Sequence, residues 1–168
     1  PGRRLVGVGD TAIAVPTGWA TNALRCGTAT EPTVVVDVAV IETCGMIGAR
    51  VYDSVWLAQG RKRELAPYED IEIDGVPAQR SGTRCIAMSV VAQRLCRATV
   101  YLPSVDASYT ATARTAPRVD QILSWIRVLP GRVAVSGFGE INVEWQDDDA
   151  GERYRAALEA DGSRSRCG

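Results

Sequence analysis

Five cysteines are the residues of this chain with the most definite chemistry. None belongs to a Cys-x-x-Cys pair and the sequence has no histidine, so both a typical zinc site and a thioredoxin-like motif are absent. We expect two disulfides, Cys26–Cys44 and Cys85–Cys96, because each closes a short loop between expected strands. Four cysteines allow three pairings, and buried free thiols in a cytosolic core are the alternative. Cys167 is left without a partner.

The predicted disulfides also indicate a compartment. Disulfides persist where the surroundings are oxidising, so we expect an extracytoplasmic protein, either secreted or anchored outside the plasma membrane. Cys167 is free, paired between chains, or paired with a cysteine outside this chain. The chain opens at Pro1 with no initiating methionine and no signal segment. We interpret it as a processed or trimmed piece, with any signal or anchor outside it.

Motifs for catalysis by histidine, lysine or a phosphate loop are missing. Without histidine there is no Ser-His-Asp triad and no Cys-His pair. A Ser-x-x-Lys arrangement would need Lys62, the only lysine, but Gln59 stands three residues before it. The nucleophile elbow, the phosphate loop and the dinucleotide fingerprint are also absent. We therefore expect no cofactor and no enzymatic activity.

Carboxylates are the remaining candidates for catalysis. Glu69, Asp70, Glu72 and Asp74 lie close together in the sequence. Two of them facing each other would form an acid/base pair at glycosidase spacing. The alternative, which we favour, is the solvated face of an alternating strand.

A second acidic cluster near the C-terminus consists of Asp147, Asp148, Asp149 and Glu152. It resembles part of a calcium loop, but Gly151 stands at the fifth position, where an EF-hand needs an acidic residue. Acidic residues at the start of a helix are explained by capping and by the helix macrodipole. We therefore expect no metal.

Tryptophans and a basic cluster are the best candidates for contact with a ligand. The cluster Arg61-Lys62-Arg63 suits anionic lipid or a wall polymer, and an exposed turn is the alternative. Tryptophan suits sugar stacking, although the single phenylalanine means that tryptophans must also supply the aromatic core. We expect ligand contacts from Trp19, Trp56, Arg61 and Arg63. The expected partner is an unknown protein or a cell-wall component.

Composition excludes two other classes of partner. The net charge is -1, so there is no basic field for a nucleic acid backbone. No apolar run is long enough to cross a bilayer, so we expect membrane attachment only through a segment outside this chain. The hydrophobic fraction of 46% and the charged fraction of 23% are ordinary for a globular domain.

Short strands dominate the expected secondary structure. Gly9-Asp10 and Asp74-Gly75 are turn signals that predict two hairpins. A polar turn near Gln93-Arg94 is expected between two further strands. The expected strands are 5–8, 11–15, 33–40, 51–57, 70–79 with its turn, 84–91, 97–102, 108–113, 132–135 and 140–145. For 51–57 a short helix is the alternative.

One helix is expected in the middle of the chain and another near its end. Thr115 is the expected cap of a helix over 115–128, and Pro130-Gly131 is expected to end it. The second helix is expected over 150–160. These elements predict an α+β fold, a mainly antiparallel sheet covered by one or two helices and stapled by disulfides. We expect a body over 1–130 and an appendage over 131–168, an incomplete second module.

Two stretches resemble known families. The segment 14–19, Ala-Val-Pro-Thr-Gly-Trp, resembles the opening of uncharacterised extracytoplasmic domains of actinobacteria and an element of Mog1/PsbP-like domains, which are αβα sandwiches. Segments 133–137 and 152–162 resemble a PASTA repeat, although its initial Val-Pro is absent here. The second resemblance implies a setting that faces the cell wall.

These observations favour a non-catalytic binding or interaction module, the sensor or spacer region of a membrane-anchored protein or lipoprotein. One alternative is a carboxylate-dependent hydrolase acting on a cell-wall or extracellular substrate. Another is a structural or assembly domain that dimerises through Cys167.

Overall fold

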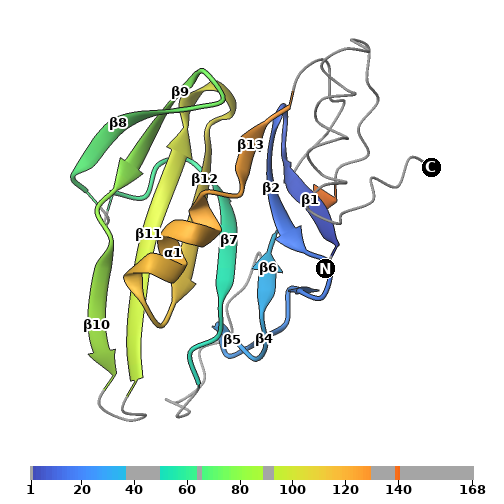
Figure 1. The fold of residues 1–168 in the computed structure, drawn as a ribbon, viewed down its shortest axis with the longest axis vertical. Helices are drawn as coiled ribbons and strands as arrows, with labels where there is room; N and C mark the ends of the chain where they lie inside the picture. Colours follow the sequence, from blue (N-terminus) through green and yellow to red (C-terminus); the bar gives the residue numbers. More distant parts are fainter. Residues whose placement is uncertain (1, 37–49, 64–65, 89–92, 130–138, 141–168) are drawn as a thin grey trace.

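The computed structural model describes residues 2–36, 50–63, 66–88, 93–129 and 139–140. In this part of the chain a small sheet, a large, mainly antiparallel sheet and a short two-stranded hairpin are accompanied by one α-helix (Figure 1). The Cys85–Cys96 disulfide joins two strands of the large sheet. The predicted α+β fold, covered by a helix and stapled by a disulfide, is therefore confirmed. The helix expected over 150–160, the strand expected over 132–135 and the acidic cluster at 147–152 lie outside the described residues.

The small sheet begins with the first predicted hairpin. β1 (Arg3–Val8) and β2 (Thr11–Pro16) pair antiparallel along their whole length. Gly9, the first of the two turn residues, has a φ of +60°, which glycine adopts without steric cost and a type II′ turn requires. β13 (Ile126–Val128) and β14 (Gly139–Glu140) complete a sheet in the order β13-β2-β1-β14.

The large sheet consists of eight strands. They are β3 (Ala20–Thr21), β6 (Thr33–Val35), β7 (Ser54–Gln59), β8 (Tyr68–Ile73), β9 (Val76–Ser81), β10 (Arg84–Met88), β11 (Gln93–Leu102) and β12 (Ala107–Ala113). Their order is β3-β6-β7-β12-β11-β9-β8, and β10 also pairs with β11. The pairs of β6 with β3 and β7 are parallel, whereas the other pairs are antiparallel. A separate short hairpin, β4 (Leu24–Arg25) with β5 (Thr28–Ala29), lies between β3 and β6 in the chain.

The second predicted hairpin, β8–β9, is confirmed with its turn. Asp74 has a φ of 49° and Gly75 a φ of 80°. Both values are positive, as a type I′ turn requires, and aspartate tolerates this region better than most residues. The Asp74 carboxylate also accepts a hydrogen bond from the backbone N–H of Val128 at 2.9 Å. The tip of this hairpin is thereby attached to β13 of the small sheet.

β9 and β10 follow each other along the same edge of β11. Arg80 lies opposite Val100, and Arg84 lies opposite Arg97. The β9–β10 segment therefore contains one more residue than β11 between these two points, which is the count that defines a β-bulge. Because of the bulge, β9 and β10 together pair along one edge of β11, although the sequence predicts them as separate strands.

The central helix is shorter than predicted. α1 (Ala116–Leu123) begins as expected, with Pro117 in its first turn and the Thr115 hydroxyl accepting a hydrogen bond from a backbone N–H at 3.3 Å. It ends at Leu123, and Ile126 belongs to β13, where it pairs with Ile13. The prediction of a helix over 115–128 was wrong at its C-terminal end. The backbone of residues 126–128 pairs with β2 instead of continuing the helix that the apolar periodicity predicted.

Two further boundaries differ from the prediction. Gln93 and Arg94, expected in a turn, are the first residues of β11. The strand expected from residue 51 begins at Ser54. Val51 uses its backbone differently: its N–H donates to Gln93 Oε1 at 2.9 Å, and its carbonyl accepts from Arg114 Nε at 3.0 Å. These side-chain bonds replace the strand pairing that the pattern predicted.

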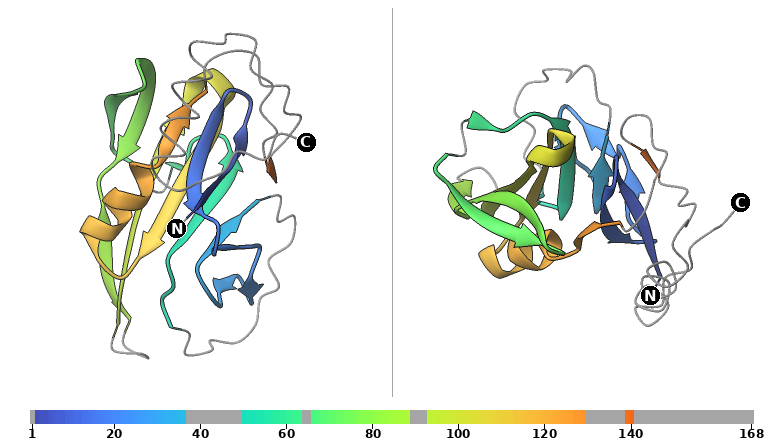
Figure 2. Two further views of the ribbon diagram at one scale, coloured as in Figure 1. Left: turned by 45° about the vertical axis from the view of Figure 1, so that its right-hand side comes forward. Right: turned by 90° about the horizontal axis from the view of Figure 1, so that it is seen from above.

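The core lies between the large sheet on one side and α1 with the small sheet on the other (Figures 1 and 2). Tyr109 of β12 is fully buried, and its hydroxyl lies 2.9 Å from Thr11 Oγ1 on β2. The Thr11 hydroxyl donates to the Val8 carbonyl, so the Tyr109 hydroxyl is the donor of the bond that joins the sheets. Trp19 and Trp125 meet edge to face in the same core, with ring centroids 5.7 Å apart.

The segment after the predicted boundary at 130 contributes to the small sheet. Glu140 of β14 pairs with Val6 of β1. The division into a body over 1–130 and an appendage over 131–168 stays a prediction. No helix in the described ranges is long and apolar enough to span a membrane.

Candidate functional site

The outer face of the large sheet, which points away from the core, carries hydroxyl side chains. On β12, Tyr109 and Ala111 face the core, so Ser108, Thr110 and Thr112 point to the other side of the sheet. All three of these polar residues are nevertheless buried. A buried polar face is uncommon and each of its groups needs a hydrogen-bond partner.

Most of the hydroxyls on this face have such a partner, but Thr112 does not. Thr99 Oγ1 and Thr110 Oγ1 lie 2.7 Å apart on neighbouring strands. At the bulge, Ser81 Oγ accepts a hydrogen bond from the Thr99 N–H at 2.9 Å. Thr112 is 7% exposed, and its Oγ1 has no hydrogen-bond partner within the described residues. Its hydroxyl is therefore both buried and unused for hydrogen bonding within that part of the chain.

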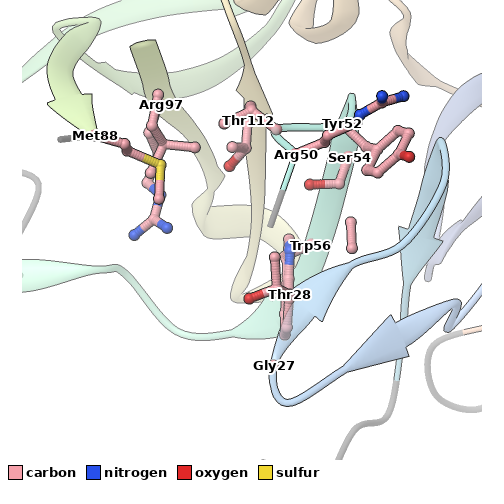
Figure 3. Close-up of a pocket in the computed structure, with 12 residues that line it drawn as sticks. Gly27, Thr28, Arg50, Tyr52, Ser54, Trp56, Met88, Arg97 and Thr112 are labelled. Atoms are coloured by element: carbon pink, nitrogen blue, oxygen red, sulfur yellow. The ribbon is translucent and has the colours of Figure 1, made fainter. Parts of the chain in front are cut away.

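Thr112 lines a pocket of about 150 Å³ on this face. The walls come from the turn between β4 and β5, from residues 50–54, and from β7, β10, β11 and β12. In Figure 3, Ser54 and Thr112 lie on the sheet, Trp56 and Thr28 lie together at one side, and Arg97 lies beside Met88 at another. Residues far apart in the sequence thus converge on one cavity.

Arg97 brings positive charge to the pocket. It is exposed, and in the sheet it lies directly opposite Thr112 on β12 and Arg84 on β10. Like charges opposite each other destabilise a strand pair. The Arg84 guanidinium hydrogen-bonds the carbonyl oxygen of Ala66. No carboxylate of the described residues pairs with Arg97, and none lines the pocket.

The structure brings only one of the four expected ligand contacts into this pocket. Trp56 lines it and is partly exposed. Trp19 is 7% exposed and packs in the core, where a ligand cannot reach its ring faces. Arg61 hydrogen-bonds Gln79 Oε1 at 2.9 Å on the same sheet face, and Arg63 is exposed in the segment that leads to β8. Neither arginine lines the pocket.

Sequence reasoning missed Arg97 and Thr112. A signal for Arg97 was present, because residues 96, 98, 100 and 102 are apolar whereas 97, 99 and 101 are polar. That alternation places Arg97 on the polar face of its strand. Its position beside Thr112 depends on the register between β11 and β12, which no local pattern encodes.

The predicted Cys85–Cys96 disulfide is confirmed. The two sulfurs are 2.04 Å apart, and the residues are directly opposite each other on β10 and β11. The bridge lies one residue from Arg97, so it fixes the hairpin that carries one wall of the pocket. Cys26 is also disulfide-bonded. Its expected partner Cys44, and Cys167, lie outside the described residues.

The acidic residues of β8 and of the turn that follows it are exposed and lie outside the pocket. Glu69, Asp70, Glu72 and Asp74 all face solvent, as the alternating-strand interpretation expects. Asp70 accepts a hydrogen bond from Gln79 Nε2 at 3.0 Å. Within the described ranges, no group of three or more histidine, cysteine or acidic residues is arranged to hold a metal ion.

Two tyrosines titrate above their ordinary range. Burial raises the pKa of Tyr109, which lies in the core between the sheets. The pKa of Tyr101 is raised mainly because its hydroxyl donates a hydrogen bond to Asp106 Oδ1 at 2.8 Å. Both phenols are neutral at physiological pH, and neither lines the pocket.

The pocket offers hydrogen-bonding hydroxyls, one aromatic side chain and positive charge, but neither a nucleophile paired with a base nor a pair of facing carboxylates among the described residues. No protein-family model, curated protein or solved structure matches this chain.

Proposed function

We propose that this chain is an extracytoplasmic, non-catalytic binding module that holds a small polar ligand in the pocket on the outer face of the large sheet. The observation that carries the proposal is that Thr112, a residue that lines the pocket, has a buried hydroxyl without a partner among the described residues. Leaving a buried hydroxyl unpaired costs about 1–3 kcal/mol. A ligand that bonds to it recovers that free energy.

The neighbouring side chains suit the same role. Trp56 presents an aromatic surface with a polar N–H, a combination that is common where ligands and partners bind. Ser54 and Thr28 add hydroxyls that donate or accept. Ligand pockets are typically apolar with a few convergent polar groups, and this pocket follows that pattern on a small scale.

The disulfide supports the proposed location. Cys85 and Cys96 are bonded, and Cys26 is bonded as well, which indicates oxidising surroundings. We propose a secreted protein or one anchored outside the plasma membrane. Such a location suits a partner at the cell wall or on another extracellular protein.

Neither alternative has a comparable observation in its favour. A carboxylate-dependent hydrolase needs two acids facing each other across a cleft. The described acids that lie close together, Glu69 to Asp74, are exposed on β8 and in the turn that follows it. The assembly alternative depends on Cys167, which lies outside the described residues and stays a prediction.

Thr112 provides the test of the binding role. Thr112→Val keeps the shape and removes the hydroxyl, whereas Thr112→Ser keeps the hydroxyl. We expect Thr112→Val to leave the free energy of unfolding unchanged or to raise it by about 1 kcal/mol, because the lost hydroxyl had no partner. Urea denaturation measures this. A loss of more than 1 kcal/mol would show that the hydroxyl serves the fold, and would contradict the proposal.

Binding is measured separately by two-dimensional ¹⁵N NMR of the full chain. Titration with a panel of neutral and charged monosaccharides and amino acids should shift the Trp56 indole N–H and the Thr112 amide. Thr112→Val should weaken the same shifts and Thr112→Ser should restore them. A panel that perturbs neither signal would count against a binding pocket at this face.

A further inference from the structure

We propose that the pocket binds an acidic sugar, a single ring that carries a carboxylate or a phosphate. This inference rests on the proposed binding role of the pocket and names its ligand class. It follows from the charge of the lining, from the kinds of uncharged groups beside that charge, and from the size of the cavity.

The arginines that line the pocket indicate an anionic ligand. Arg97 lines the pocket and its side chain is exposed. Arg50 also lines the pocket, on the side of Tyr52. No acidic residue of the described chain pairs with Arg97 or Arg50. The guanidinium fork binds carboxylate and phosphate oxygens through two parallel hydrogen bonds.

The uncharged side chains of the pocket indicate which kind of molecule bears the anionic group. Trp56 offers an aromatic ring, and Thr112, Ser54 and Thr28 offer hydroxyls at several positions around it (Figure 3). A sugar ring has apolar C–H faces that suit an aromatic surface and hydroxyls that suit threonine and serine. A purely apolar anion would leave the Thr112 hydroxyl unpaired.

The cavity volume limits the ligand to one ring. Pockets for drug-sized molecules measure roughly 300–1,000 Å³. The volume here is about 150 Å³, so only one residue of a longer polymer fits inside. The remainder of a polymer would extend past the exposed side chain of Arg97 into solvent.

The test uses isothermal titration calorimetry on the full, oxidised chain with four probes. Glucuronate and glucose 6-phosphate carry the ring and an anion, glucose carries the ring alone, and inorganic phosphate carries the anion alone. The variants are Arg97→Gln and, as a matched control, Arg94→Gln. Arg94 is also exposed on β11 but lies outside the pocket.

We expect at least one acidic sugar to bind more tightly than glucose and phosphate. Arg97→Gln should weaken that binding about tenfold, because hydrogen bonds to a charged group contribute most of the discrimination. Arg94→Gln should leave it unchanged. Binding of glucuronate but not of glucose 6-phosphate, or the reverse, identifies the anionic group.

Three other outcomes would overturn the proposal in distinguishable ways. Equal binding of glucose and the acidic sugars, unaffected by Arg97→Gln, removes the acidic class and leaves the binding role intact. Phosphate binding as tightly as the sugars shows that the ring contributes nothing. No binding of any probe, together with no NMR response of the Trp56 indole to the broader panel, removes the ligand class and the binding role together.

Discussion

Two buried hydroxyls on the same sheet face have different roles. Ser81 replaces a ladder hydrogen bond at the bulge by accepting from the Thr99 N–H at 2.9 Å. Thr112 supports no such bond among the described residues. The first hydroxyl therefore supports the fold, and the second is the one on which the proposed binding role depends, although a burial value alone would not separate them.

Ser81→Ala should reveal this structural role. The substitution leaves the buried Thr99 N–H without an acceptor, so we expect a loss of about 1–3 kcal/mol in the free energy of unfolding. Urea denaturation measures the loss. Ser104→Ala, at an exposed residue of the 3₁₀ turn after β11, is the control and should change stability by less than about 0.5 kcal/mol. Equal effects of the two substitutions would contradict this role of Ser81.

Tyr109 should make the protein sensitive to alkali. Burial raises its pKa in the folded state, whereas in the unfolded chain it ionises near pH 10. The stability linked to the neutral phenol is complete below pH 10 and is lost as the pH rises towards the folded pKa. Raising the pH from 10 to 11 should lower the free energy of unfolding, so that at pH 11 about 1.4 kcal/mol of the contribution from Tyr109 is lost.

The comparison that isolates this effect is Tyr109→Phe. We expect it to cost about 1 kcal/mol at neutral pH, from the lost bond to Thr11, and to flatten the decline in unfolding free energy between pH 9 and 11. Tyr101→Phe, at a phenol hydrogen-bonded near the surface, should flatten the decline much less. An unchanged decline in Tyr109→Phe would rule out this residue as the source of alkaline sensitivity.

At the scale of elements, the tip of the β8–β9 hairpin has two functions. Asp74 adopts the left-handed backbone conformation of the turn and bonds the Val128 N–H of β13. Asp74→Ala should lower the free energy of unfolding by about 1–2 kcal/mol. Alanine disfavours this backbone region, and its side chain cannot accept the hydrogen bond from Val128. Asp74→Asn keeps both properties and should lose less than about 0.5 kcal/mol.

Hydrogen exchange distinguishes the two contributions of Asp74. The Val128 amide should exchange faster in Asp74→Ala and at nearly the wild-type rate in Asp74→Asn. If both variants were equally unstable and equally fast to exchange at Val128, the carboxylate charge would matter rather than the acceptor and the turn conformation.

Local chemistry made some elements predictable. Gly9-Asp10 and Asp74-Gly75 specify their turns because few residues accept a positive φ. Thr115 specified the start of α1 for a similarly local reason, because its hydroxyl accepts a hydrogen bond from a backbone N–H of the first turn. The end of α1 depended on a distant event, since Ile126 fits the helical stripe but pairs with Ile13.

The pocket was less predictable than the fold for the same reason. Trp56 was a candidate by residue type alone, and the structure brings it to the pocket. Thr112 and Arg97 became neighbours only through the β11–β12 register. Trp19, Arg61 and Arg63 shared residue types with true lining residues but occupy other places in the fold.

At the scale of the whole molecule, the two faces of the large sheet have separate tasks. One face is covered by α1 and the small sheet, and bonds such as that between Tyr109 and Thr11 join these layers. The other face holds the hydroxyls and the pocket. Substitutions at Thr112 and Arg97 can therefore change binding without changing the core, which makes the proposed function separable from stability.

The state of the cysteines is the property that links the whole chain to its surroundings. Of five cysteines, Cys26, Cys85 and Cys96 are disulfide-bonded. Because Cys85 and Cys96 bond each other, Cys26 requires a further cysteine as its partner. With the expected Cys26–Cys44 pairing, protein from an oxidising compartment should show one reactive thiol per chain when denatured without reductant, and five after reduction.

A thiol titration in guanidinium chloride, paired with non-reducing electrophoresis, checks this count. One thiol and a monomer band fit the predicted pairing with Cys167 free. No thiol together with a dimer band would favour the assembly alternative, since Cys167 would then bridge two chains. Three or more thiols would contradict the two bridges and, with them, the oxidising compartment on which the proposed extracytoplasmic role depends.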